Sequence, residues 1–141
     1  MNHKIRTVLL IDDSDFDNLF HERVIRKSEL VENVIIKTSG IDALEYLIEN
    51  QRLNRTSPDI IFLDINMPGM NGWEFIEQYQ KLEETSKSRV VLVMLTTSEN
   101  PKDLSKAREY PAISDYKIKP LSKPVLEEVI NHYFPEKGKL L

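Results

Sequence analysis

An unbroken apolar run that ends in an acid constrains the fold of this chain more than any other feature. Ile60–Leu63 are four consecutive apolar residues, and Asp64 follows directly. Such a run is typical of a parallel strand that is covered on both faces. The carboxyl ends of these strands form the edge of an α/β sheet where ligands bind. Asp64 is therefore expected at a binding edge, although a lone acid can also simply cap a turn.

The rest of the chain alternates between strand and helix patterns. Strands are predicted at residues 7–11, 34–36, 60–63, 90–95 and 116–118, with helical periodicity between and after them. Strands that alternate with helices pair in parallel through right-handed crossovers. The pattern therefore predicts a doubly wound α/β sheet with helices on both faces.

Each helix is expected to bury the apolar residues that recur at helical spacing. Ser14 or Asp15 is expected to cap the first helix, and Ser122 and Pro124 to begin the last one. The polar stretch of residues 50–58 is predicted to be the longest loop. The residues expected to face inward are Phe16, Leu19, Phe20 and Val24; Ile41, Leu44, Leu47 and Ile48; Phe75, Ile76, Tyr79 and Leu82; Leu104 and Ala107; and Val125, Leu126, Val129, Ile130 and Tyr133.

Length and composition narrow the class of protein. The 141 residues predict one domain, with a core at about residues 6–134, short tails and no room for an output domain. The chain has no cysteine, and we find no signal peptide and no apolar stretch long enough to span a bilayer. We therefore expect a soluble cytoplasmic protein. The net charge of -4 argues against binding to nucleic acid.

Five polar residues follow or end four of the predicted strands and should meet at one edge of the sheet: Asp12, Asp13, Asp64, Thr96 and Lys119. Three carboxylates in one crevice repel each other, and a hard divalent cation such as Mg²⁺ relieves that repulsion. Mg²⁺ leaves positions for phosphate oxygens, to which a lysine and a threonine can also bind. The set predicts a phosphoryl site with Asp64 as the nucleophile. The alternative is a structural network of ion pairs.

Four motifs in this order resemble the receiver domain of two-component response regulators, of the chemotaxis-regulator type. They are Asp12-Asp13 after an apolar run, residues 63–72, Leu95-Thr96, and residues 116–120. The resemblance covers about residues 6–133. It implies a flavodoxin-like (βα)5 fold with five parallel strands in the order 2-1-3-4-5.

The resemblance also implies roles for the acids of the site. Asp64 would accept a phosphoryl group from a phosphohistidine on a sensor histidine kinase or a histidine phosphotransfer protein. Asp13 and Asp64 would bind Mg²⁺ directly, Asn66 would do so through its backbone carbonyl, and Asp12 would act mostly through a bound water.

The same resemblance implies a conformational switch. Lys119 would pair with Asp64 and later with a phosphoryl oxygen, aimed by a cis peptide bond to Pro120. Thr96 would rotate toward the phosphoryl group, and Tyr116 would turn inward in response. The phosphorylated protein would then bind a downstream protein partner that the sequence does not identify, with no role for nucleic acid or membrane.

Some residues depart from the family pattern or carry no chemical signal. Pro111 and its neighbours replace the usual glycine before the fifth strand, so the output face around the fourth helix is expected to differ. The three histidines, His3, His21 and His132, have no metal-site spacing. His21 is expected to be a solvated surface residue, and Asp15 and Asp17 to favour the dipole of the first helix.

Other functions use some of the same residues. A relay receiver would pass its phosphate to another histidine. A hydrolase of the haloacid dehalogenase type also has an aspartate nucleophile, but resembles Asp-x-Asp after the first strand, whereas Asp64 lies on the third and is followed by Ile65-Asn66. A scaffold that works without phosphorylation is disfavoured because all five site residues are present.

The residue after Thr96 leads to a first prediction. Thr97 is bulkier than the alanine or glycine that the family usually has there, and the resemblance implies that it borders the path of the hydrolytic water. We expect a Thr97→Ala variant to lose its phosphate faster than the parent when decay is followed after removal of the phosphodonor. An equal or slower decay would contradict a shielding role.

Overall fold

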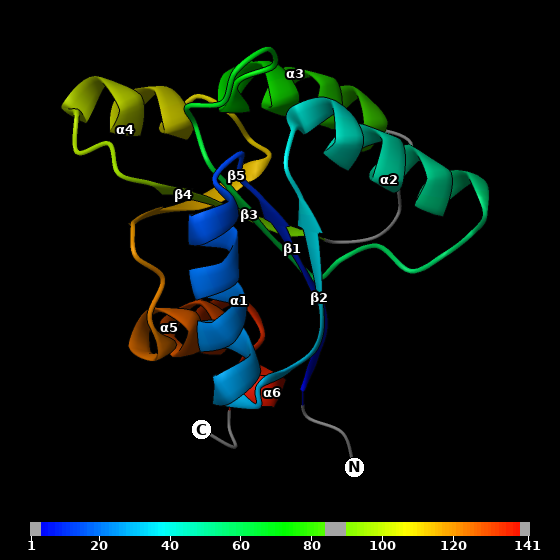
Figure 1. The fold of residues 1–141 in the computed structure, drawn as a ribbon, viewed down its shortest axis with the longest axis vertical. Coiled ribbons are helices and arrows are strands. Elements are labelled where there is room, and N and C mark those ends of the chain that lie inside the picture. The colour runs from blue at the N-terminus through cyan, green and yellow to red at the C-terminus, as the bar shows by residue number, and fades with distance from the viewer. Residues whose placement is uncertain (1–3, 84–89, 139–141) are drawn as a thin grey trace.

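Five parallel strands form the sheet of the computed structural model, which describes residues 4–83 and 90–138 (Figure 1). Their order is β2-β1-β3-β4-β5, as the resemblance implies. The first and last strands begin earlier than predicted, and the second is longer at both ends. The strands are β1 (Ile5–Ile11), β2 (Val31–Lys37), β3 (Ile60–Leu63), β4 (Val91–Thr96) and β5 (Ile113–Ile118).

Helices cover both faces of this sheet, which confirms the doubly wound architecture. In Figure 1, α1 and α5 lie on one face, and α2, α3 and α4 lie on the other. No helix within the described residues is both long and apolar enough to cross a membrane. The helices are α1 (Asp15–Ser28), α2 (Gly40–Arg52), α3 (Gly72–Glu83), α4 (Pro101–Arg108), α5 (Lys123–Tyr133) and the short α6 (Pro135–Gly138).

The burial of each strand follows its place in the sheet. Every residue of β3 and of β4 is buried, whereas the edge strands β2 and β5 are mostly half-buried. A central parallel strand is covered on both faces, so its side chains are almost all apolar, and Thr96 at the end of β4 is the exception within these two strands. One cluster lies under α1 and α5 around Leu10 and Phe62, and the other lies under α2 and α3 around Leu9 and Phe75.

Helix α1 buries a different face from the one that its apolar periodicity predicts. Phe16 is 77% exposed, Leu19 48% and Phe20 43%. Its buried residues are instead Asn18, His21, Ile25 and Ser28. The inner face is polar because α1 begins at the site edge, where the Asn18 side chain donates a hydrogen bond to the Asp12 carbonyl at 2.8 Å. The cap itself is as predicted, since Ser14 accepts from the backbone N–H of Asp17 at 3.1 Å.

The other helices agree better with the sequence, apart from two residues of α2 and Leu104 of α4, which is expected to face inward but is 37% exposed. In α2, the predicted inward residues Ile41 and Ile48 are exposed, whereas Gly40, Ala43 and Leu47 are buried. Helix α2 also continues to Arg52, so the loop after it begins at Leu53 rather than at residue 50. The inner faces of α3 and α5 are confirmed by the burial of Phe75, Ile76, Tyr79, Leu126, Val129 and Ile130.

The end of α4 is built without a glycine. Its last turn ends at Glu109 in an ordinary right-handed conformation, with φ -79°. The next residue, Tyr110, stacks on Trp73 of α3 with ring centroids 5.8 Å apart, and Lys106 lies over the same indole ring. Aromatic stacking and a cation–π contact thus fix this end of α4 to α3.

Two glycines shape the loop between β3 and α3, which carries Asp64. Gly69 has a φ of +74°, where a side chain is strained. Gly72 has no such strain, but an added Cβ would lie 2.7 Å from the Asp64 carbonyl oxygen and 2.9 Å from the Ile65 Cα. The loop therefore folds back closely on the chain at Asp64.

This contact predicts a difference between two alanine variants. Gly72→Ala forces backbone atoms apart, so we expect it to lower the free energy of unfolding by about 3 kcal/mol. Gly69→Ala meets open space and is expected to cost only about 1 kcal/mol for the unfavourable φ. Urea unfolding of both variants measures the difference. Equal losses would show that the close approach at Gly72 relaxes freely.

Candidate functional site

Strand register brings three carboxylates together. Ile11 of β1 and Leu63 of β3 are register partners, and the backbone N–H of Asp64 donates to the Ile11 carbonyl at 3.0 Å. Asp12 and Asp64, which follow these strands, are therefore neighbours. One carboxylate oxygen from each of Asp12, Asp13 and Asp64 lies within 4.8 Å of the others. Asp12 and Asp64 are buried, while Asp13 is exposed, so the cluster opens to solvent on one side.

The surroundings of Asp64, the acid that follows the central strand, change its pKa. Burial and then the charge of Asp12 raise the pKa of Asp64 from 3.8 to about 6, although the nearby Lys119 opposes the shift. A buried carboxylate beside others gains most from a bound cation. The donor set consists of hard oxygens with one open side, so the pocket fits a divalent metal ion.

Lys119 lies at the end of β5 and extends into the acids. Its Nζ donates to Asp12 Oδ2 at 2.6 Å and to Asp17 Oδ2 at 2.8 Å. The expected pairing with Asp64 is present as an ion pair at 3.6 Å, which is longer than a hydrogen bond. Burial alone would lower the pKa of Lys119, but the bonds to Asp12 and Asp17 outweigh it and raise the pKa above the ordinary value.

Asp17 is a member of this site that sequence reasoning missed. Its position offered a signal, since Asp17 lies in the first turn of the helix that begins directly after the acidic pair Asp12 and Asp13. The sequence interpretation assigned Asp17 only to the helix dipole. Asp17 is half-buried and reaches Lys119 from the first turn of α1. The site is thus built from β1, β3, the end of β5 and the first turn of α1.

Thr96 and Tyr116, the two residues expected to act as a switch, are connected to this cluster through the end of β4. Thr96, the last residue of β4, is fully buried, and its carbonyl accepts the N–H of Lys119 at 2.8 Å. Its hydroxyl accepts from the N–H of Ser98 at 3.2 Å. Tyr116 is half-buried and donates its hydroxyl to the Ser98 carbonyl at 2.9 Å. Both side chains therefore meet the same short loop after β4.

Two further predicted features are found near the site. Asn66 lies two residues after Asp64 and is exposed, and its role as a metal ligand stays a prediction. The peptide bond between Lys119 and Pro120 is cis, as the resemblance implies.

The expectation for His21 is wrong. Its side chain is 3% exposed and faces a small cavity that Asn18, Asp12 and Asp64 also line. The Oδ1 atom of Asn18 is buried there without a hydrogen-bond partner. Burial first, and then the charge of Lys119, lower the pKa of His21, so the imidazole is neutral at pH 7. His132 is exposed, and His3 lies outside the described residues.

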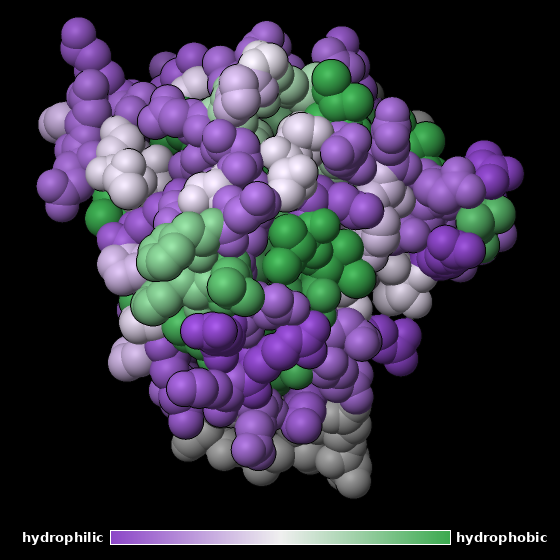
Figure 2. All heavy atoms as spheres, viewed as in Figure 1, coloured by the Kyte–Doolittle hydropathy of each residue, from purple (hydrophilic) through white to green (hydrophobic). Residues whose placement is uncertain are grey.

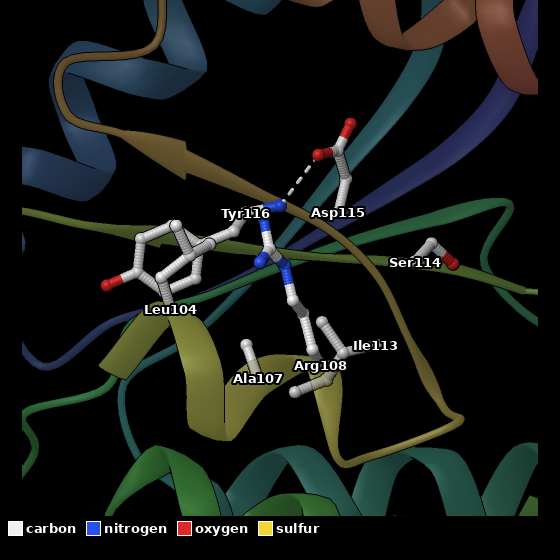
Figure 3. A pocket seen from close by; sticks show the side chains of 7 residues that line it. All are labelled: Leu104, Ala107, Arg108, Ile113, Ser114, Asp115 and Tyr116. Carbon is white, nitrogen blue, oxygen red and sulfur yellow. Dashed lines mark hydrogen bonds between the residues drawn. The ribbon is translucent and has the colours of Figure 1, made fainter. Parts of the chain in front are cut away.

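A groove of about 340 Å³ lies between α4 and β5 (Figure 3). Figure 3 shows Arg108 extending from α4 toward β5, near Asp115 and Tyr116. The acidic side chain is held in place, because Asp115 accepts the backbone N–H of Tyr116 at 2.8 Å. Tyr116 thus connects this groove to the loop after Thr96.

The chain belongs to the response regulator receiver domain family, whose model matches residues 8–131. This match confirms the resemblance and spans both acidic motifs, Thr96 and Lys119. The fold, the strand order and the acidic pocket described above are those of a phosphoacceptor domain in two-component signalling.

Known proteins of this family resemble the chain over most of its length. The crystal structure of a two-component response regulator from Cytophaga hutchinsonii is 37% identical and has a TM-score of 0.85, with 92% of this chain and 96% of that chain covered. The response regulator ARR6 of Arabidopsis thaliana is 36% identical over 98 residues, which cover 66% of this chain and 50% of ARR6.

Response regulator Rcp1 of Synechocystis sp. is a third relative, 29% identical over 100 residues, with 70% of this chain and 67% of Rcp1 covered. A structure of the Mn²⁺-bound form of Rcp1 has a TM-score of 0.70 at 26% identity and covers 91% of this chain and 93% of that chain. The chain thus spans about half to two thirds of the curated sequences of ARR6 and Rcp1.

The raised pKa of Asp64 predicts a pH-dependent gain in stability for Asp64→Asn without metal. The folded protein binds a proton on Asp64 more readily than the unfolded chain, so its stability falls as the pH rises from 3.8 to about 6. Asp64→Asn has no carboxyl group to titrate at this position, so its stability does not fall in this pH range for that reason. We expect it to match the parent below about pH 4 and to exceed it by about 2 kcal/mol above about pH 6.5.

Urea unfolding with a chelator, at several pH values, measures this gap. Addition of Mg²⁺ should narrow it, because the cation binds the folded parent more tightly than the variant. A gap that is independent of pH would mean that the Asp64 carboxyl does not titrate differently in the folded protein.

Proposed function

We propose that this chain is a phosphorylatable switch in which Asp64 accepts a phosphoryl group from a phosphohistidine. One observation carries the proposal: a buried carboxylate at the end of the central strand lies among two further carboxylates and the ammonium group of Lys119. Such a site combines a nucleophile with charges that can neutralise a phosphoryl group.

The covalent step is a transfer between two side chains. A carboxylate oxygen of Asp64 attacks phosphorus, the phosphorus–nitrogen bond of the phosphohistidine breaks, and its electron pair stays on the imidazole, which then takes up a proton. The product is an acyl phosphate. Because the pKa of Asp64 is about 6, most of the protein carries the nucleophilic carboxylate at neutral pH. Lys119 then binds a phosphoryl oxygen, and Thr96 donates its hydroxyl to another.

We assign the metal to Mg²⁺, held by Asp13, Asp64 and the backbone carbonyl of Asn66, with Asp12 acting through a water. The bound cation would neutralise charge between the carboxylates and the phosphoryl oxygens. The oxygen donors support this choice, as does the Mn²⁺-bound form of the relative Rcp1. Mn²⁺ and Mg²⁺ share the preference for oxygen ligands.

The output of the switch is a change in partner binding. When Thr96 turns toward the phosphoryl group, its hydroxyl leaves the loop after β4, to which Tyr116 is also bonded. Tyr116 would then turn inward and reshape the groove beside α4. A charge added at a bistable element is a common basis for such switching.

The biological setting follows from the same proposal. The phosphodonor is a sensor histidine kinase or a histidine phosphotransfer protein, and the signal is passed to a downstream protein in the cytoplasm. The chain acts as one signalling domain and does not turn over a separate substrate. A methylesterase relative from Burkholderia thailandensis shares 113 aligned residues, but these cover only 29% of that enzyme.

Mass spectrometry tests the assignment of Asp64. After incubation with acetyl phosphate and Mg²⁺, we expect the parent to gain one phosphoryl group and Asp64→Asn to gain none. A chelator should abolish the gain because the reaction needs the metal. Hydroxylamine should remove the label, since it cleaves acyl phosphates.

Two outcomes would contradict the proposal. Equal labelling of the parent and of Asp64→Asn would move the phosphoacceptor elsewhere. Sustained turnover of p-nitrophenyl phosphate, with many product molecules per protein, would favour the hydrolase alternative instead.

A further inference from the structure

Lys119 has more acidic neighbours than a lysine that serves only the phosphoacceptor would need. Its Nζ is hydrogen-bonded to Asp12 and to Asp17, whereas its distance to Asp64 is 3.6 Å. An ammonium group has three hydrogens to donate. In this resting arrangement, two of them are therefore committed to residues other than the phosphoacceptor.

These partners differ in how readily they can release Lys119. The side chains of Asp12 and Asp64 are 7% and 9% exposed, whereas that of Asp17 is 33% exposed. A carboxylate that reaches solvent regains hydration when it loses its partner, but a buried one does not. Asp17 is also outside the group of acids that could hold the metal, among the residues that the structure describes. Asp17 is thus the partner that Lys119 can leave at least cost.

A phosphoryl group on Asp64 changes this balance. It adds a charge of about -1.5 to -2 and three strong acceptor oxygens close to Lys119. We propose that Asp17 is a positioning residue that holds Lys119 in the resting site, and that phosphorylation of Asp64 draws Lys119 away from Asp17. The strength of the contact between Asp17 and Lys119 then sets the balance between the two states. This inference rests on the proposed phosphorylation of Asp64.

The contact also connects the site to α1. Asp17 lies in the first turn of α1, next to the exposed Phe16. Figure 2 shows apolar side chains gathered around the position of α1 on an otherwise largely hydrophilic face. Loss of the ion pair would free the side chain of Asp17 but leave the helix start intact, because the cap uses the Asp17 N–H and the Ser14 hydroxyl. Phosphorylation would therefore change side-chain contacts on α1 as well as those around Tyr116.

The chain offers a matched control for this contact. Asp15 lies in the same first turn and is exposed. Asp15→Asn removes the same charge from the same helix end, and so reproduces the general effect on the dipole and on the field at the site. Only Asp17→Asn also removes an acceptor from Lys119. Asp17→Glu keeps the charge and serves as the conservative variant.

The experiment measures the affinity for beryllofluoride with Mg²⁺, which mimics the phosphorylated state. We expect Asp17→Asn to bind it about fivefold more tightly than Asp15→Asn does, which corresponds to an ion pair of about 1 kcal/mol. Asp17→Glu should return toward the parent. In the metal-free protein, NMR of the Lys119 ammonium group should show faster proton exchange with water in Asp17→Asn than in Asp15→Asn.

Each result decides between the two proposals. If Asp17→Asn and Asp15→Asn agree in both measurements, the inference about Asp17 is overturned while the proposed function stands. If the parent itself binds no beryllofluoride, both are overturned. Shifts in the amide signals of α1 on beryllofluoride binding that are seen in the parent and diminished in Asp17→Asn, but retained in Asp15→Asn, would support the link to the helix.

Discussion

The ammonium group of Lys119 makes the acidic end of this sheet possible. Strand register forces Asp12 and Asp64 to be neighbours, and both are buried, so their charges repel each other with little help from solvent. Lys119 compensates by donating to Asp12 and by lying 3.6 Å from Asp64. The compensation is incomplete, because burial first, and then the charge of Asp12, still raise the pKa of Asp64 above its ordinary value. The remaining excess of negative charge is what a divalent cation can neutralise.

The sequence predicted the sheet and most of the site because both depend on local signals. An apolar run marks a buried strand, and the residue that follows it must lie at the carboxyl edge, whatever the helices do. The amino-acid sequence alone was therefore enough to place Asp12, Asp13, Asp64 and Lys119 together. The family match over residues 8–131 and the observed strand order agree with that prediction.

Helix α1 shows where such reasoning fails. Apolar periodicity assumes that the inside is apolar, but the inner face of α1 begins against a polar site and carries Asn18 and His21. The helical spacing of Phe16, Leu19 and Phe20 therefore predicted a buried face, but these residues lie at the surface. The role of Asp17 was missed for a related reason, because an acid in a first helical turn already has a sufficient explanation in the helix dipole. Only the three-dimensional contact with Lys119 distinguishes the two roles.

The stacking of Trp73 on Tyr110 has a consequence for spectroscopy. The chain contains one tryptophan, and its indole contacts both Lys106 of α4 and Tyr110, which lies just after that helix. Indole emission is sensitive to the groups that touch the ring. The intrinsic tryptophan fluorescence of this protein therefore reports on the attachment of α4 to α3.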